Sequence, residues 1–358
     1  MAKERIIAFH RANKLGDNVV AIKALYALKE LYPDFKLMVL TNGVGLALYR
    51  HLGFIDYIFD IDKSAEMARV HELEFLIITH RCSSNIALAK SLNVRKIIMY
   101  AHVYSLFTSR FQVVFPRGIN SHHESENLLY LVRAINKAHF DKNFPLIDFS
   151  QARLIAGSEN RMFVEEFFTK EKLRRESKNL HSVTESCKSH QNTKPSKIHK
   201  DNTSKKIITI NIFVSFQKPC NFSLVEWVEI INTLCACFTK INFILTSFVG
   251  TQYDLRACKE LNAPNCKIFV NNADILNLIA LFERVDALIS VDTGNIHIAD
   301  NMRLPTFGLY NRAVLKRWGG GSYGGVFEAF CVENAPKVGD KELFIQKAIA
   351  FLERVCVS

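Results

Sequence analysis

The sequence predicts an α/β fold made of two doubly wound halves, each a parallel sheet with helices on both faces. Short apolar runs alternate with segments of helical period from residue 5 to residue 169, and the alternation starts again at residue 206. A polar stretch with few large apolar side chains separates the two series. The length of 358 residues also suits two domains of ordinary size.

The first half begins with an apolar run and continues as an alternation of strands and helices. Strands are expected at Arg5–Phe9, Lys36–Leu40, Asp56–Phe59, Phe75–Thr79 and Lys96–Tyr100. Helices are expected at Asn18–Leu31, Gly43–His51, Ala65–His71, Asn85–Leu92, His122–Ala138 and Glu159–Thr169. In the first helix Val19, Ile22 and Leu25 recur at helical spacing, and Pro33 follows its end. We expect residues 1–169 to form one domain.

The stretch Lys170–Ser204 differs from both flanks because it is rich in Lys, Ser, Asn, His and Thr. Together with the two lysines that follow, it holds 11 Lys or Arg against 4 Asp or Glu, which is most of the formal net charge of +11. Such a composition cannot bury enough apolar surface to offset the entropy of ordering. We expect residues 170–204 to be a flexible linker or surface insert. Attraction to an anionic partner, such as lipid headgroups or nucleic acid, is the alternative interpretation.

The second half repeats the alternation. Strands are expected at Lys206–Phe213, Asn242–Thr246, Lys267–Val270, Asp286–Val291 and Thr306–Tyr310. Helices are expected at Ser223–Cys237, Tyr253–Leu261, Ile275–Glu283, Ile296–Met302 and Lys341–Val355. Ser223 followed by Glu226 is a capping box. We expect residues 205–340 to form the second domain and the tail, 341–358, to pack back on the first. The strand ends of the two sheets should face each other across a crevice.

The cysteines and the hydropathy indicate the compartment. The nine cysteines are scattered and form no C-x-x-C pair, which fits a reducing compartment better than a disulfide framework or a zinc site. No run of about 18 uncharged apolar residues occurs, and no signal-peptide core follows the N-terminus. We expect a cytoplasmic protein that does not span a membrane but could touch its surface.

The first candidate site is the turn Lys14-Leu15-Gly16-Asp17, between the first strand and its helix. Ligands of open α/β sheets bind at the carboxyl ends of strands, where this turn lies. Gly16 would let the backbone pass closely under a ligand, and Asp17 would face the crevice from the helix N-terminus. The alternative is that Asp17 is only the N-cap of the helix.

The second candidate site is Ser290–His297, where an apolar strand ends in a small polar turn and a helix begins. Free N–H groups and the helix dipole make such a helix start favourable for an anion. The Thr293 hydroxyl and the Gly294 amide could hold diphosphate oxygens, and His297 could point towards the same anion. A capped helix with a hydrogen-bonded histidine is the alternative.

Further candidates lie in three loops. Ser215 and Lys218 follow the first strand of the second half, where Lys218 could pair with a diphosphate or be an ordinary exposed loop lysine. His80 and Arg81 follow a first-half strand and could face an anionic acceptor, or they could be ordinary loop residues. The triplet Asp60-Ile61-Asp62 has the D-x-D spacing of metal-binding sites in some glycosyltransferases, but it follows an edge-like strand, so we expect no metal there.

Taken together, these motifs resemble glycosyltransferase family 9, the bacterial heptosyltransferases of lipopolysaccharide core synthesis. The resemblance rests on K-L-G-D near the N-terminus, a loop lysine before a helix in the second half, and D-T-G-N-I-H-I-A followed by Pro305 and an apolar strand. It spans most of the chain. The run after Lys218, Pro-Cys-Asn-Phe, departs from the basic-aromatic pattern that is usual there, and the 170–204 insert is unusually long.

The resemblance implies a GT-B fold, with two Rossmann-like domains and the donor held mainly by the second. It also implies inverting transfer of a heptose from ADP-heptose to the lipopolysaccharide core, without a cofactor or metal. Asp17 falls on the catalytic base. Lys218 and Ser215 fall near the donor diphosphate, and the donor-binding block comprises Asp292, Thr293, Gly294 and His297. Candidate acceptor groups are Lys14, His80 and Arg81. The acceptor, with its lipid A, would bring the protein to the cytoplasmic face of the inner membrane.

Three other functions are weighed against this interpretation. The same fold could transfer a different activated sugar to another glycan or lipid-linked acceptor. A nucleic-acid-binding protein is less consistent, because the basic stretch has almost no interleaved aromatic residues for base stacking. A dinucleotide-dependent oxidoreductase would need a G-x-G-x-x-G turn after a strand, and no expected strand is followed by one.

Overall fold

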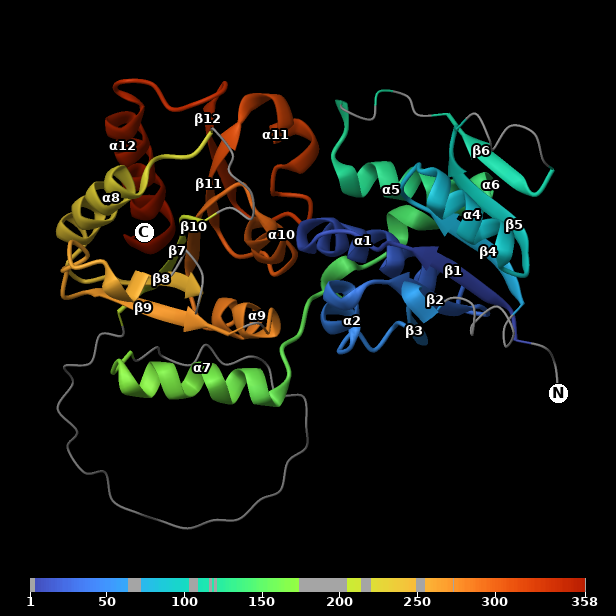
Figure 1. Cartoon of the computed structure of the whole chain (residues 1–358), viewed down its shortest axis with the longest axis horizontal. Coiled ribbons are helices and arrows are strands. Elements are labelled where there is room, and N and C mark those ends of the chain that lie inside the picture. Colours follow the sequence, from blue (N-terminus) through green and yellow to red (C-terminus); the bar gives the residue numbers. More distant parts are fainter. Residues whose placement is uncertain are drawn as a thin grey trace, which may run out of the picture.

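The computed structural model confirms the predicted α/β fold with two six-stranded parallel sheets (Figure 1). It describes residues 4–63, 72–102, 109–115, 118, 121–173, 205–213, 220–248, 255–272 and 274–357. The first sheet has the order β3-β2-β1-β4-β5-β6 and the second has the order β12-β11-β10-β7-β8-β9. Read from the first strand of each half, the two orders are the same. Each domain is therefore a Rossmann-like unit whose strand order reverses beside its first strand.

The strands lie close to the predicted apolar runs. Their bounds in the first sheet are β1 (Ile6–His10), β2 (Lys36–Thr41), β3 (Tyr57–Asp60), β4 (Leu73–Ile78), β5 (Val94–Tyr100) and β6 (Phe111–Val114). In the second sheet they are β7 (Ile207–Asn211), β8 (Asn242–Phe248), β9 (Cys266–Asn271), β10 (Ala287–Val291), β11 (Thr306–Asn311) and β12 (Phe327–Val332). The edge strands β6 and β12 were not predicted, because each mixes polar and apolar residues over a short length.

The helices cover both faces of the sheets. In the first half they are α1 (Leu15–Leu31), α2 (Gly43–Tyr49), α4 (Ser83–Ser91), α5 (Glu124–Arg133), α6 (Lys137–Asn143) and α7 (Ser158–Lys170). In the second half they are α8 (Leu224–Cys237), α9 (Leu276–Phe282), α10 (Gly294–Asn301), α11 (Arg312–Trp318) and α12 (Asp340–Leu352), which a π-helical turn at Glu353–Val357 continues. Single 3₁₀ turns occur at Ile61–Lys63, Phe144–Leu146, Phe149–Gln151 and Leu255–Ala257.

Several helix predictions need correction. The helix predicted at His122–Ala138 is broken, because the Asn136 side chain accepts a hydrogen bond from the His139 amide and so caps a new helix, α6. The short helix α11 was not predicted. Of the helix predicted at Tyr253–Leu261, the described part holds only the 3₁₀ turn. The helix predicted at Ala65–His71 and most of the 170–204 segment lie outside the described residues. The capping box of Ser223 and Glu226 at the start of α8 is confirmed.

The tail helix α12 packs on the second domain, so the prediction that it returns to the first domain is wrong. Its Phe344 is fully buried, and its ring centroid lies 5.2–5.5 Å from those of four other aromatic residues: Phe222, Trp227, Phe307 and Phe330. This aromatic cluster joins α12 to α8 and to the second sheet.

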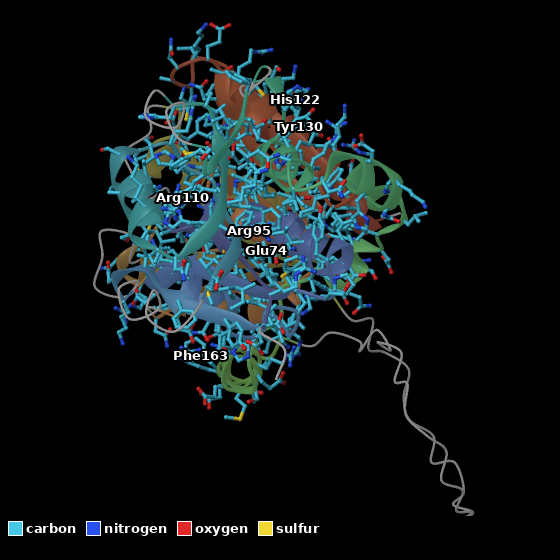
Figure 2. The ribbon with its side chains drawn as sticks, turned by 90° about the vertical axis from the view of Figure 1, so that its right-hand side faces the viewer. Glu74, Arg95, Arg110, His122, Tyr130 and Phe163 are labelled. Atoms are coloured by element: carbon cyan, nitrogen blue, oxygen red, sulfur yellow. The ribbon has the colours of Figure 1, made fainter. Side chains whose placement is uncertain are left out.

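Helix α7 also packs on the second domain although it precedes the polar insert (Figure 1). Phe163 of α7, labelled in Figure 2, has its ring centroid 5.8 Å from that of Phe269 in β9. Asn160 donates hydrogen bonds to Asp274 at 2.7 Å and to Asn277 at 2.8 Å. The chain has therefore crossed to the second domain before α7 begins, so the first domain ends earlier than the predicted residue 169.

The two domains meet through α1 and α10, which lie side by side at the centre of Figure 1. Further hydrogen bonds tie the segment after α11 to the first domain. Lys23 of α1 donates to the carbonyl oxygen of Ser322 at 2.8 Å, and the His123 Nε2 lies 2.8 Å from the carbonyl oxygen of Gly319. The two domains are therefore in direct contact.

Candidate functional site

The candidate site lies where the central strands of both sheets end. In the first sheet the order reverses between β1 and β4, and in the second it reverses between β7 and β10. Loops after these strands flank the place where open α/β sheets bind ligands. The turn after β1 leads into α1 and the turn after β10 leads into α10, so the α1–α10 contact brings these two ligand-binding edges together.

Asp17 lies in the first turn of α1 and is not its N-cap. The helix begins at Leu15, three residues earlier than predicted, and Lys14 occupies the N-cap position without a side-chain capping hydrogen bond. The interpretation of Asp17 as an N-cap is therefore wrong. Its carboxylate is 22% exposed, and its Oδ1 accepts a hydrogen bond from Nη2 of Arg11 at 3.0 Å. A partly exposed carboxylate at the helix start can both meet a ligand and be held in one orientation.

Arg11 is the buried partner of Asp17, and its side chain is only 2% exposed. Its Nε also donates to the backbone carbonyl oxygen of Asp17 at 3.0 Å, so the guanidinium forms hydrogen bonds with both the side chain and the backbone of this residue. The Arg11 backbone is fixed by Thr41, whose hydroxyl donates to the Arg11 carbonyl oxygen at 2.7 Å. Arg11 was not among the predicted site residues, although only two residues separate it from the K-L-G-D turn.

The turn after β10 forms a capped helix start. Thr293 is the N-cap of α10, and its hydroxyl accepts a hydrogen bond from the Asn295 amide. Asn211, at the end of β7, donates to the Thr293 hydroxyl at 3.3 Å and to that of Ser290 at 3.2 Å. Asp292 is buried, and its amide donates to the Leu309 carbonyl oxygen at 3.0 Å. These contacts order the turn before any ligand arrives.

Two glycines allow α1 and α10 to approach closely. A Cβ atom added to Gly16 would lie 2.6 Å from Cδ2 of His297, and one added to Gly294 would lie 2.7 Å from Cδ2 of Leu15. The space beside Gly16, predicted to admit a ligand, therefore holds a histidine ring. That ring is buried, and its centroid lies 5.9 Å from that of Trp318. The missing side chains thus serve contact between the domains.

The proposed acceptor groups share one edge of the first domain. Lys14 follows β1, while His80 and Arg81 follow β4, which pairs directly with β1. All three residues are exposed, and Nη1 of Arg81 donates a long hydrogen bond to the Ala101 carbonyl oxygen at 3.4 Å. This edge therefore presents positive charge to solvent next to Asp17.

Other predicted features contribute less to this site. Ser215 and Lys218 lie outside the described residues. Asp60 ends the edge strand β3, and its Oδ1 accepts a hydrogen bond from the Asp62 amide. Within the described residues, no group of three or more His, Cys, Asp or Glu side chains is placed to hold a metal ion. No helix in the described part of the chain is long and apolar enough to cross a membrane.

His10, at the end of β1, should make stability depend on pH. It is buried, and neither ring nitrogen has a hydrogen-bond partner among the described residues. Burial lowers the pKa of His10 to about 4, and the nearby Arg11 and His80 charges add to this shift. The unfolded chain, with a histidine pKa near 6.5, binds a proton first as the pH falls. Stability is therefore lost between about pH 6.5 and pH 4.

Replacing His10 with leucine should reduce this pH dependence. Urea unfolding at pH 7 and pH 4.5 gives the unfolding free energy that each protein loses between these two pH values. This loss should be ~2–3 kcal/mol smaller in His10→Leu than in the unaltered protein. Other titrating groups are common to both proteins and cancel in the comparison. An equal loss of unfolding free energy in the two proteins would contradict the prediction.

Comparison with known families identifies the chain. The sequence model of glycosyltransferase family 9 (heptosyltransferase) matches residues 160–342, just over half of the chain. The chain belongs to glycosyltransferase family 9. It is therefore a glycosyltransferase, and the match includes the whole block from Asp292 to His297. Asp17 lies outside the matched residues. A search of curated proteins finds no match.

Solved structures support the GT-B fold of this family member over nearly its whole length. The glycosyl transferase family 9 from Veillonella parvula DSM 2008 has a TM-score of 0.74, and the alignment covers 99% of this chain and 98% of that one. The E. coli ADP-heptose lps heptosyltransferase II has a TM-score of 0.67, with coverages of 99% and 98%. The E. coli heptosyltransferase WaaC with ADP has a TM-score of 0.62, with coverages of 97% and 99%. Sequence identity is 12% in each case, so the likeness shows the fold.

Proposed function

We propose that this family 9 glycosyltransferase transfers a heptose, with inversion and without a metal, from ADP-heptose to the inner core of lipopolysaccharide. The observation that carries the proposal is the close contact of α1 with α10, in which Gly16, the neighbour of Asp17, lies against the first turn of α10: a Cβ atom added to Gly16 would lie 3.5 Å from Cα of Gly294. Solved structures of WaaC with ADP and with ADP-2-deoxy-2-fluoro heptose, on the same fold, support an ADP-linked donor.

The proposed roles follow from the chemistry of transfer. An acceptor hydroxyl is a poor nucleophile, so a base has to take its proton during attack at the anomeric carbon. Asp17 is the proposed base, and it acts from the face opposite to the departing ADP, which inverts the anomeric centre. Negative charge grows on the leaving diphosphate, and the N-terminus of α10, with Thr293 and Gly294, offsets it. Lys218 and Ser215 are proposed to assist from the neighbouring loop, and Asp292 and His297 to complete the donor site.

The acceptor is proposed to lie on the edge formed by Lys14, His80 and Arg81. Phosphate groups of the inner core and lipid A are anionic, and exposed cations at this edge would attract them. Binding there places the acceptor hydroxyl beside Asp17, which belongs to the same edge. It also places the protein at the cytoplasmic face of the inner membrane during transfer.

Calorimetric titration with ADP, UDP and GDP in excess chelator tests the donor. We expect binding of ADP to be at least tenfold tighter than that of the other two, an approximate margin of 1.4 kcal/mol. Release of ADP from ADP-heptose in the presence of a core acceptor should then proceed in the same chelator. A preference for UDP or GDP would replace the heptose donor by another activated sugar, and a strict need for Mg²⁺ or Mn²⁺ would contradict the metal-free mechanism.

A further inference from the structure

Asp17 belongs to a row of four charged side chains that runs from the first domain into the second. Nη2 of Arg11 donates to Oδ1 of Asp17 at 3.0 Å and to Oε1 of Glu124, on α5, at 3.3 Å. The other carboxylate oxygen of Glu124 accepts a hydrogen bond from Nε of Arg317, on α11, at 2.9 Å, and it forms an ion pair with Nη2 of the same arginine at 2.9 Å. The row therefore alternates in charge, and Glu124 is the member that touches both domains.

The two central members of the row are shielded from water. The side chain of Arg11 is 2% exposed and that of Glu124 is 6% exposed. Charges at such depth interact strongly, and each depends on its partner because an unpaired buried charge is costly. Asn127 adds a longer hydrogen bond to Glu124 at 3.4 Å. The guanidinium of Arg11 is thus clamped between two carboxylates and cannot turn away from Asp17.

Sharing this guanidinium matters for a residue that has to accept a proton. Such a residue has to be held in a fixed orientation relative to the hydroxyl whose proton it takes. The second carboxylate on the same nitrogen, that of Glu124, keeps the guanidinium in the place where it orients Asp17. Glu124 is itself held by Arg317 when the second domain is docked. Arg11 then orients Asp17, and Glu124 holds Arg11 in place. Arg317 of the second domain in turn holds Glu124.

We propose that Glu124 is a positioning residue for sugar transfer, which makes the orientation of Asp17 depend on docking of the second domain through Arg317. The inference rests on the proposed function, in which Asp17 is the base. Glu124 need not touch either substrate. Its effect on the rate therefore acts through Asp17, and it should disappear when Asp17 can no longer accept a proton.

A matched control is available on the outer side of α5. His122 and Tyr130 lie near each other at the upper part of Figure 2, with ring centroids 5.9 Å apart, and His122 pairs with Glu126 at 3.4 Å. The Glu126 side chain is 57% exposed. Glu126→Gln removes the same charge from the same helix as Glu124→Gln, without touching Arg11.

The experiment measures ADP release from ADP-heptose with an inner-core acceptor, together with donor affinity by calorimetry. The variants Glu124→Gln, Arg317→Gln and Glu126→Gln are each made alone and combined with Asp17→Asn. We expect Glu124→Gln and Arg317→Gln to lower kcat roughly tenfold, with donor Kd changed by less than about twofold. In the Asp17→Asn background neither should lower the residual rate further. Glu126→Gln should match the unaltered protein in both backgrounds.

Each contrary result has a distinct meaning. A loss of rate that persists in the Asp17→Asn background, or a change confined to donor affinity, would overturn the role of Glu124 and leave the proposed function intact. Rates of both variants equal to that of Glu126→Gln would do the same. If Glu124→Gln does not fold, Arg317→Gln decides, since its side chain is a third exposed. Full activity of Asp17→Asn alone, or no transfer by the unaltered protein, would overturn the proposed function as well.

Discussion

Replacing Asp17 with asparagine is expected to lower the rate of transfer by about 10²–10⁴-fold. Asparagine keeps the size of the side chain and an oxygen that can accept the hydrogen bond from Arg11, so the first turn of α1 should be preserved. It cannot take a proton from the acceptor hydroxyl. The loss should appear in kcat, with nucleotide affinity nearly unchanged, because the proposed donor groups belong to the second domain.

Glu30→Gln is the control for this measurement, because Glu30 is an exposed acid at the opposite end of the same helix. Steady-state rates and calorimetric affinities for ADP are measured for both variants. Turnover by Asp17→Asn at the rate of Glu30→Gln would remove Asp17 from the mechanism. A parallel loss of ADP affinity would instead assign Asp17 to donor binding.

Replacing Phe344 with alanine is expected to lower the free energy of unfolding by about 3–5 kcal/mol. The ring is fully buried and meets four other aromatic residues edge to face or tilted. Its removal forfeits the burial of a large apolar group and leaves a cavity, which rigid neighbouring rings cannot fill. The effect should be confined to the second domain, because α12 packs on α8 and on the second sheet.

Leu343→Ala provides the matched control, because Leu343 precedes Phe344 on α12 and is 44% exposed. Denaturant unfolding of both variants gives the difference in free energy at unchanged slope. We expect a change of less than about 1 kcal/mol for Leu343→Ala. Similar values for the two variants would show that the aromatic cluster does not hold α12 in place.

The fold could be predicted because its pattern is local. Buried strands such as β1 and β10 are continuous apolar runs, and α8 carries its own capping box. Helix α5 ends earlier than its apolar period predicts, because the Asn136 side chain accepts a hydrogen bond from the His139 amide and starts a new helix. The packing of α12 could not be predicted, because Phe344 on its own does not indicate which domain holds its aromatic partners.

The candidate site was predictable only in part, for a related reason. Asp17 and the Asp292–His297 block each lie where a strand leads into a helix, so their positions in the sequence indicate their location in the fold. Glu124 meets Arg11 across 113 residues of chain, and no local pattern connects them. The role of Gly16 could not be predicted from the sequence either, because the ring beside it, that of His297, belongs to the other domain.

The route of the chain between domains has a consequence for how such enzymes can be recombined. Phe149 still packs against Tyr26 of α1, whereas the carbonyl oxygen of Ala152 is already bound by Asn301 of α10, and α12 does not return. Each domain is therefore a contiguous block of the gene, joined to the other at one junction. Chimaeras of two family members could be made with a single cut there. Their compatibility would depend on whether the residues facing Gly16 and Gly294 leave room for the foreign helix.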